Sequence, residues 1–284
     1  MSALEARIRA LPCWQGEPAL TPLKGGLSNL SFVAEDRTAK FVVRCGGDIP
    51  VHHVFRDREW AASVAAHAAG IAPEVIHGAP GLLVLRFIEA KTYGEEDVRA
   101  NIPRVATLLQ AVHRDVALKL AGPPNAFWVF HVIRDYARLL DAESKYAPLA
   151  GRLEAMQMPL PIVFGHHDLL PGNILDDGRR LWLIDWEYGA FGTAMFDLAN
   201  AASNASFTAA DDEALLAAYF GQVSDAHRRS FDAMKAASAL REALWALVSE
   251  RHLRTEGVDY RAHAREFLAR TDRAVRLVEE RYGA

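Results

Sequence analysis

Three oxygen-bearing side chains in the middle of the chain have types and spacing that suit metal-assisted chemistry. Asp168 is followed five residues later by Asn173, and Asp185 comes directly after the apolar run LWLI. Carboxylate and amide oxygens are ligands that Mg²⁺ prefers, and a further carboxylate can accept the proton of a hydroxyl group. Transfer of a phosphoryl group from ATP needs both. The spacing predicts Asp168 as a catalytic base and Asn173 and Asp185 as ligands of Mg²⁺.

An ordinary structural explanation also exists for these residues. The segment from Asp168 to Asn173 could be a turn capped by its own side chains, and Asp185 could simply end a strand. At average composition the same three residues at these offsets arise by chance in roughly one chain in twenty or thirty. The apolar runs before each Asp and a glycine-rich segment upstream favour the functional interpretation. His166 is expected to shape the loop by packing and bonding to backbone.

The glycine-rich segment LKGGLSNLSFVAE lies between two apolar runs, and its alternation from Leu30 to Ala34 predicts a strand. An isolated Gly-Gly pair is more often an ordinary hairpin turn. If a nucleotide binds downstream, its phosphates need a second wall, and glycines let backbone N–H groups approach them closely. We therefore expect phosphate contacts from Gly25, Gly26, Ser28 and Asn29.

Two charged residues are expected to complete the nucleotide site. Arg44 lies on the predicted strand Lys40–Cys45, where protein kinases carry a phosphate-binding lysine, and Glu59 lies on the helix that follows. A guanidinium can bridge a phosphate and a carboxylate, although a surface ion pair would explain both residues equally well. In the segment VLRFIE, the backbone of Arg86, Phe87 and Ile88 would face adenine.

The order of patterns along the chain predicts an α+β fold with two lobes. The first ninety residues read as mainly β with one helix, from about Phe55 to Ala69, and two short strands flank the turn Gly78–Gly81. From Glu95 on, helical periodicity dominates, except around the segment that holds the chemical residues. We expect an N-terminal nucleotide-binding lobe, residues 1–88, and a larger, mainly helical catalytic and substrate-binding lobe, residues 89–284.

Composition narrows the classes of partner. With 32 Lys and Arg against 36 Asp and Glu, the net charge is −4, so no basic field points to nucleic acid or anionic lipid. Two cysteines cannot form a disulfide framework, and we expect reduced thiols in a cytoplasmic protein. No apolar run reaches about 18 residues, which argues against a membrane span. The expected partner is a small molecule, and the oligomeric state stays open.

Four longer motifs together resemble the choline/ethanolamine kinases, particularly their bacterial LicA-like branch, within the aminoglycoside-phosphotransferase/kinase-like superfamily. They are GGLSNLSF, FGHHDLLPGNIL, LWLIDWEYGAFGTAMFDLAN and LWALVSE, and the resemblance runs from about Leu23 to Arg273. An arginine at position 44 also favours this family. The resemblance implies a two-lobed protein-kinase-like fold, ATP as donor, Mg²⁺ as cofactor and a small alcohol as acceptor.

The resemblance also assigns roles. It implies that Asp197 is a structural acid that braces the catalytic loop, and that Glu187, Tyr188 and Trp245, with Asp168, line the pocket for a cationic substrate. A quaternary ammonium group donates no conventional hydrogen bond, so aromatic faces and carboxylates must hold it. Core packing is the alternative for Trp245, which lies at helical spacing among apolar residues.

Two positions depart from the family pattern. Glu242 stands where choline kinases commonly carry a second tryptophan, and Asn204 stands at an acidic position of the cation pocket. The leading prediction is an ATP-dependent kinase of a small cationic alcohol, choline first or ethanolamine. A thiamine kinase and an aminoglycoside phosphotransferase are the alternatives on the same fold. A nucleotide-binding pseudokinase is the non-enzyme alternative, which the intact Asp168, Asn173 and Asp185 oppose.

Overall fold

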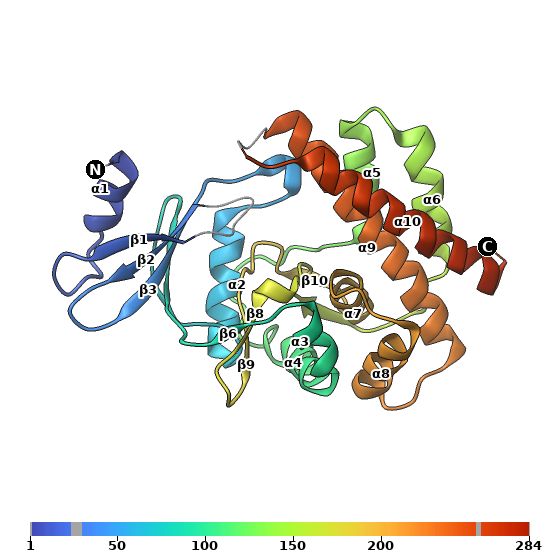
Figure 1. The fold of residues 1–284 in the computed structure, drawn as a ribbon, viewed down its shortest axis with the longest axis horizontal. Coiled ribbons are helices and arrows are strands. Elements are labelled where there is room, and N and C mark those ends of the chain that lie inside the picture. Colours follow the sequence, from blue (N-terminus) through green and yellow to red (C-terminus); the bar gives the residue numbers. More distant parts are fainter. Residues whose placement is uncertain (1, 24–29, 254–256, 284) are drawn as a thin grey trace.

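The computed structural model describes residues 2–23, 30–253 and 257–283 and separates a sheet-rich end of the molecule from a helical end (Figure 1). The elements of the sheet-rich end are α1 (Ala3–Arg9), β1 (Ala19–Leu23), β2 (Leu30–Glu35), β3 (Lys40–Cys45), the 3₁₀ helix η1 (Pro50–His52), α2 (Arg56–Ala68), β4 (Val75–Ala79) and β5 (Leu82–Arg86).

Helices dominate the rest of the described chain. Its elements are β6 (Lys91–Thr92), α3 (Glu95–Ala100), α4 (Ile102–Asp115), α5 (Val129–Leu139), α6 (Glu143–Ala155), β7 (Ile162–Gly165), the 3₁₀ helix η2 (Pro171–Asn173), β8 (Ile174–Asp176), β9 (Leu181–Leu183), β10 (Ala190–Thr193), α7 (Ala194–Asn204), α8 (Ala209–Phe220), α9 (Asp225–His252) and α10 (Tyr260–Tyr282). The predicted α+β, two-lobed architecture is confirmed.

The N-terminal sheet is antiparallel, with strand order β1-β2-β3-β5-β4. Alternate residues of β2 and β3 point to one face, so that Phe32, Ala34, Phe41 and Val43 form a small core with α1, whose Ile8 is fully buried. The predicted strands Leu30–Ala34 and Lys40–Cys45 are confirmed. This core is separate from the larger one that fills the helical end.

One prediction about the helices of the N-terminal region was wrong, and another is confirmed. The prediction of a single helix in the first ninety residues was wrong, because α1 precedes the sheet; it is a seven-residue helix with a capping box between Ser2 and Glu5, too short to show helical periodicity. The predicted helix from Phe55 to Ala69 is confirmed as α2, and Gly70, with φ +75°, ends it.

Helix α2 belongs to the larger core, although it follows the N-terminal strands in the chain. Its buried Ala62, Ala65 and Ala66 are part of the cluster that contains the helices of the C-terminal end. Between α2 and the sheet lies a cavity of about 30 Å³, lined in part by Trp60 and Leu82. The predicted division at residue 88 stays a prediction, and the packing places α2 with the elements that follow it.

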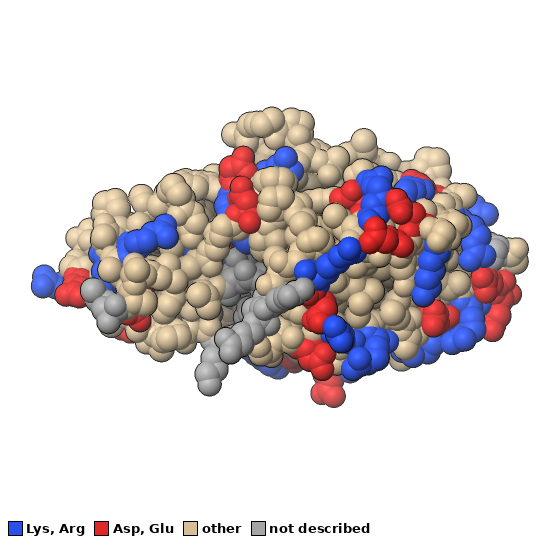
Figure 2. All heavy atoms as spheres, turned by 90° about the horizontal axis from the view of Figure 1, so that it is seen from above, with Lys and Arg blue, Asp and Glu red and all other residues tan. Residues whose placement is uncertain are grey.

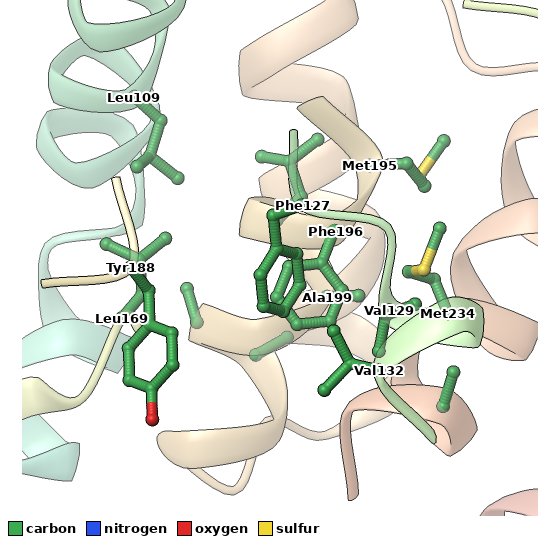
Figure 3. Close-up of a cluster of buried hydrophobic side chains, with 14 of the residues drawn as sticks. Leu109, Phe127, Val129, Val132, Leu169, Tyr188, Met195, Phe196, Ala199 and Met234 are labelled. Carbon is green, nitrogen blue, oxygen red and sulfur yellow. The ribbon is translucent and has the colours of Figure 1, made fainter. Parts of the chain in front are cut away.

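Two small sheets frame the segment that carries the predicted chemical residues. β7 pairs antiparallel with β10, and β8 pairs with both β6 and β9. Beneath them lies a cluster of buried side chains around Phe127 and Phe196, with Tyr188 and Leu169 at one side of it (Figure 3). The site is therefore built on the surface of the larger core.

The surface shows no charge segregation on the face drawn in Figure 2, where basic and acidic side chains are interspersed over the helical end. Among the described helices, none combines the length and apolar character needed to cross a bilayer. Both cysteines, Cys13 and Cys45, are free thiols, and burial raises the pKa of Cys45 to about 11.

His52 ties η1 to two helices of the larger core. Its Nδ1 lies 3.0 Å from the hydroxyl of Tyr136 on α5, and its Nε2 lies 2.9 Å from Oγ of Ser249 on α9. Burial, together with the positive charge of Arg241, lowers the pKa of His52 to about 3. The imidazole is therefore neutral in the folded protein but takes up a proton near pH 6.5 once the chain unfolds.

We expect Gly192→Ala to destabilise the protein by about 1–3 kcal/mol because no space is left for a methyl group at position 192. A Cβ on Gly192 would lie 2.7 Å from Nε2 of the buried His167 and 2.9 Å from the carbonyl oxygen of Phe127. Gly172→Ala is the matched control, since no described atom lies within 4 Å of the position that its new methyl group would take. Equal urea midpoints for the two variants would contradict the packing argument.

The neutral state of His52 predicts acid sensitivity. As the pH falls below about 6.5, only the unfolded state gains this proton, so the free energy of unfolding falls by up to about 1.4 kcal/mol per pH unit. Between pH 7 and pH 5, His52→Gln should lose about 2 kcal/mol less stability in urea unfolding than the parent protein. His131→Gln, at an exposed position, should lose as much as the parent.

Candidate active site

The structure brings Asp168, Asn173 and Asp185 to one place. The side-chain amide of Asn173 donates to the Asp168 carbonyl over 2.9 Å, and the Asn173 carbonyl accepts from the amide of Ile184 over 3.0 Å. The loop after β7 is thereby bonded to the residue that precedes Asp185. Asp185 itself has φ +69°, an uncommon backbone conformation for a residue other than glycine.

His166 links the two aspartate-bearing loops. Its Nδ1 accepts a hydrogen bond from the backbone amide of Asp168 at 3.2 Å, and its Nε2 donates to the carbonyl of Ile184 at 2.9 Å. Burial lowers the pKa of this imidazole and so keeps it neutral. A neutral imidazole can accept a hydrogen bond at one nitrogen and donate at the other. The structure agrees with the structural role predicted for His166.

Three side chains on one face of helix α7 form hydrogen bonds with the loop that carries Asp168. Asp197 is fully buried and accepts hydrogen bonds from the amides of His166 and His167, both at 2.8 Å, and from Nε2 of His113 at 2.9 Å. Burial alone would raise the pKa of its carboxyl, but His167 and these donors hold it well below its usual range. Asp197 therefore does what a brace of the catalytic loop must do.

The other two braces on α7 are amides. The side-chain oxygen of Asn200 accepts from the amide of Leu169 at 2.6 Å, and the side-chain nitrogen of Asn204 donates to the carbonyl of Leu169 at 3.3 Å. Asn204, which stands at an acidic position of the family's cation pocket, is thus engaged with the loop backbone. An asparagine can donate here, whereas a carboxylate could not.

A cluster of buried charges joins the N-terminal sheet to the site. The guanidinium of Arg44 on β3 lies 2.7 Å from Asp185, 3.1 Å from Glu59 and 3.4 Å from Glu187, and only 11% of its side chain is exposed. Burial by itself lowers the pKa of Arg44, but these three carboxylates outweigh it and keep the pKa above its ordinary value. Arg44 and Glu59 meet as the sequence analysis expected.

Arg56 is part of this cluster and was not identified from the sequence. Its Nη1 lies 2.5 Å from Glu59 and 2.9 Å from Glu187, which is 131 residues away. Its position three residues before Glu59, in the first turn of a predicted helix, was a weak signal for the first contact. Arg44 and Arg56 together pair with three acids, Glu59, Asp185 and Glu187.

The donor set suits a hard cation that arrives with phosphates. The side-chain nitrogen of Asn173 is fixed by the Asp168 carbonyl, so its oxygen is the atom left to bind a metal. The described residues contain no cluster of three histidine, cysteine or acidic side chains that could hold a metal. Mg²⁺ typically uses one or two protein oxygens together with phosphates, and Asn173 with Asp185 fits that pattern.

The Asp168 carboxyl lies in a dry and acidic environment. Burial raises its pKa to about 8, and Glu242, Asp185 and Glu187 act in the same direction, while Arg241 lowers it. A carboxylate with a pKa near neutrality has a high affinity for a proton from a hydroxyl group.

The two aromatic residues predicted to line a cation pocket have other side chains packed against their rings. The guanidinium of Arg241 on α9 lies 4.5 Å from the centre of the Tyr188 ring. Trp245, one turn further along α9, packs against His52 and Tyr260 at ring distances of 5.4 and 5.8 Å. Arg241 was not identified from the sequence, where a charged residue within an apolar helical stretch was the available signal.

Glu242, the residue in place of a tryptophan, is held between two basic groups. One carboxylate oxygen lies 2.9 Å from Nη1 of Arg241, and the other lies 2.9 Å from Nε2 of His263 on α10. Burial alone would raise the pKa of Glu242, but these two partners outweigh it and hold the pKa below its usual range. Position 242 therefore carries an anionic side chain that is paired on both sides.

Other predicted nucleotide contacts have mixed outcomes. Gly25, Gly26, Ser28 and Asn29 lie outside the described residues. At the predicted hinge, the amide of Arg86 donates to the carbonyl of Glu74 and that of Phe87 to the carbonyl of Lys40. These two N–H groups are therefore engaged within the protein, and the contact of this segment with adenine stays a prediction.

The chain is similar to known phosphotransferases. The family described as "Phosphotransferase enzyme family" matches residues 19–234. Protein LicA of Haemophilus influenzae is 26% identical over 278 residues, 90% of this chain and 79% of the relative. A crystal structure of a choline/ethanolamine kinase family protein from Mesorhizobium loti is 30% identical, covers 95% of this chain and 93% of that chain, and has a TM-score of 0.78.

A further solved structure, of LicA in complex with AMP, shares the fold with a TM-score of 0.75 at 24% identity over 99% of both chains. The two-lobed, kinase-like fold expected from the motifs is thereby confirmed. The chain belongs to the phosphotransferase enzyme family and, within it, to the choline/ethanolamine kinase family.

Proposed function

We propose that this enzyme is an ATP-dependent kinase that phosphorylates the hydroxyl group of a small alcohol of the choline/ethanolamine class. The observation that carries the proposal is the convergence of Asp168, Asn173 and Asp185 through hydrogen bonds of their own loops. The names of the relatives support the acceptor class, and the AMP complex of a protein with this fold makes an adenine nucleotide the donor to test first.

Asp168 is the proposed catalytic base. Its backbone is fixed on both sides, by His166 at the amide and by Asn173 at the carbonyl, so the loop that carries its carboxylate is held in one position. The carboxylate accepts the proton of the acceptor hydroxyl while the new oxygen–phosphorus bond forms and the bond to the leaving nucleoside diphosphate breaks. The proton lost by the alcohol thus ends on Asp168, and the leaving oxygen takes the electron pair of the broken bond.

Asn173 and Asp185 are the proposed ligands of Mg²⁺. The ion, when bound, neutralises charge on the phosphates of the donor. Arg44 lies 2.7 Å from Asp185 and carries a fork of N–H donors, so it can contact the phosphates while Glu59 keeps it oriented. Arg56 extends the same network to Glu187 and positions that residue at the acceptor side.

Asp168→Ala should abolish phosphoryl transfer and spare nucleotide binding. Loss of the general base should lower kcat by about 10²–10⁴-fold, while the dissociation constant for ATP, measured by calorimetry, changes little. Asp225→Ala, at a fully exposed carboxylate on α9, is the control and should keep the parent's kcat. A kcat for Asp168→Ala equal to that of the parent would refute the base assignment.

Asp185→Asn should raise the Mg²⁺ concentration needed for half-maximal activity by at least about tenfold, because a neutral amide binds the ion less tightly than a carboxylate. The measurement is a coupled assay of ADP release over a magnesium titration. The titration midpoint for Glu89→Gln, which changes an exposed acid, should match that of the parent protein. An unchanged midpoint for Asp185→Asn would remove Asp185 from the metal site.

A further inference from the structure

Arg241 is an unusual residue for the place it occupies. Only 2% of its side chain is exposed, and its guanidinium stacks over Tyr188 at 4.5 Å from the ring centre. Its Nη1 lies 2.9 Å from Glu242 and 3.6 Å from the carboxylate of Asp168. A permanent positive charge of the chain itself therefore lies between the proposed catalytic base and an aromatic face.

Fold stability does not account for this arginine. Its Nε and Nη2 are buried and have no hydrogen-bond partner in the part of the chain that the structure describes. A buried guanidinium with unpaired donors costs free energy that an apolar side chain would not. Its neighbours on α9, Leu240, Ala243 and Leu244, are fully buried, so an apolar residue would suit position 241 as part of the core.

The guanidinium covers an aromatic face of the kind that a trimethylammonium group needs. The acceptor must lie beside Asp168, because this carboxylate takes the proton of its hydroxyl group. A quaternary ammonium next to it would be held by an aromatic face, and here the Tyr188 face already carries Arg241. The Trp245 ring offers no replacement, since His52 and Tyr260 pack on it. A second cation here would also meet carboxylates that Arg241 already pairs, since its guanidinium lies 2.9 Å from Glu242 and 3.6 Å from Asp168.

We propose that Arg241 is a specificity-determining residue that excludes a quaternary ammonium group from the Tyr188 face. The inference rests on the proposed kinase function, and it narrows the acceptor to small alcohols without a trimethylammonium group at this position. Choline is accordingly a poor acceptor, and the exclusion depends on the positive charge that Arg241 places beside the ring.

The test compares two alcohols of the same shape. Choline and 3,3-dimethylbutan-1-ol differ in having nitrogen or carbon at the branched centre, so only choline is charged. Dissociation constants from calorimetry and kcat/KM values from the coupled assay are measured for both. The parent protein should bind and use the neutral alcohol at least as well as choline. Arg241→Met frees the ring and removes the charge, so the ratio of choline to neutral alcohol should rise about tenfold.

Arg241→Lys is the matched variant, because it keeps the charge and loses the planar guanidinium. It should retain the preference of the parent for the neutral alcohol. If Arg241 served only to support the fold or to tune Asp168, Arg241→Met would weaken both alcohols equally, and an unchanged ratio would overturn the proposal. A parent protein that binds choline tenfold better than the neutral alcohol would overturn it as well.

The two readouts separate this inference from the proposed function. Phosphorylation of neither alcohol nor ethanolamine, with binding ratios as expected, would contradict the kinase and leave the role of Arg241 supported. Failure of both alcohols to bind the parent and the Arg241→Met variant would contradict the inference, because the Tyr188 face would then not be the acceptor site. Thermal unfolding of both variants confirms that each is folded.

Discussion

The site depends on the hydrogen bonds that the buried carboxylate of Asp197 accepts from the loop before Asp168. A charge without solvent is tolerated only when it is fully engaged, and Asp197 accepts from two successive backbone amides and from His113. Those amides belong to His166, whose ring accepts a hydrogen bond from the amide of Asp168, and to His167, whose ring contacts the carbonyl of Tyr188. His166 then reaches across to the residue before Asp185. One carboxylate thus sets the geometry of both loops, although it contacts neither the base nor the proposed metal ligands.

Much of this arrangement was predictable because its signals are local in the sequence. Alternating side chains identified β2 and β3, and a helix stop at Gly70 identified the end of α2. The spacing from Asp168 to Asn173 reflects a loop that closes on itself through a hydrogen bond between its ends. Such short-range constraints leave a pattern that a single sequence carries.

The features that escaped prediction depend on contacts between distant segments. Arg56 could be paired with Glu59 from its spacing, but its bond to Glu187 spans 131 residues. Arg241 looks like a surface residue by type, and only packing of α9 against the catalytic loop shows that it is buried. In the segment predicted to face adenine, the partners of the Arg86 and Phe87 amides, Glu74 and Lys40, could likewise not be identified from the sequence.

The allocation of α2 to the larger core has a mechanical consequence. Glu59 lies on α2, which packs with the helical end, whereas Arg44 lies on the five-stranded sheet, and a cavity of about 30 Å³ lies between α2 and the sheet at this point. Rotation of the sheet relative to the rest would slide Arg44 along a row of carboxylates without disturbing α2 or the loop of Asp168. In such a rotation Arg44 would change partners among Glu59, Asp185 and Glu187, which would keep their places. The boundary between the two parts would then run between β3 and α2.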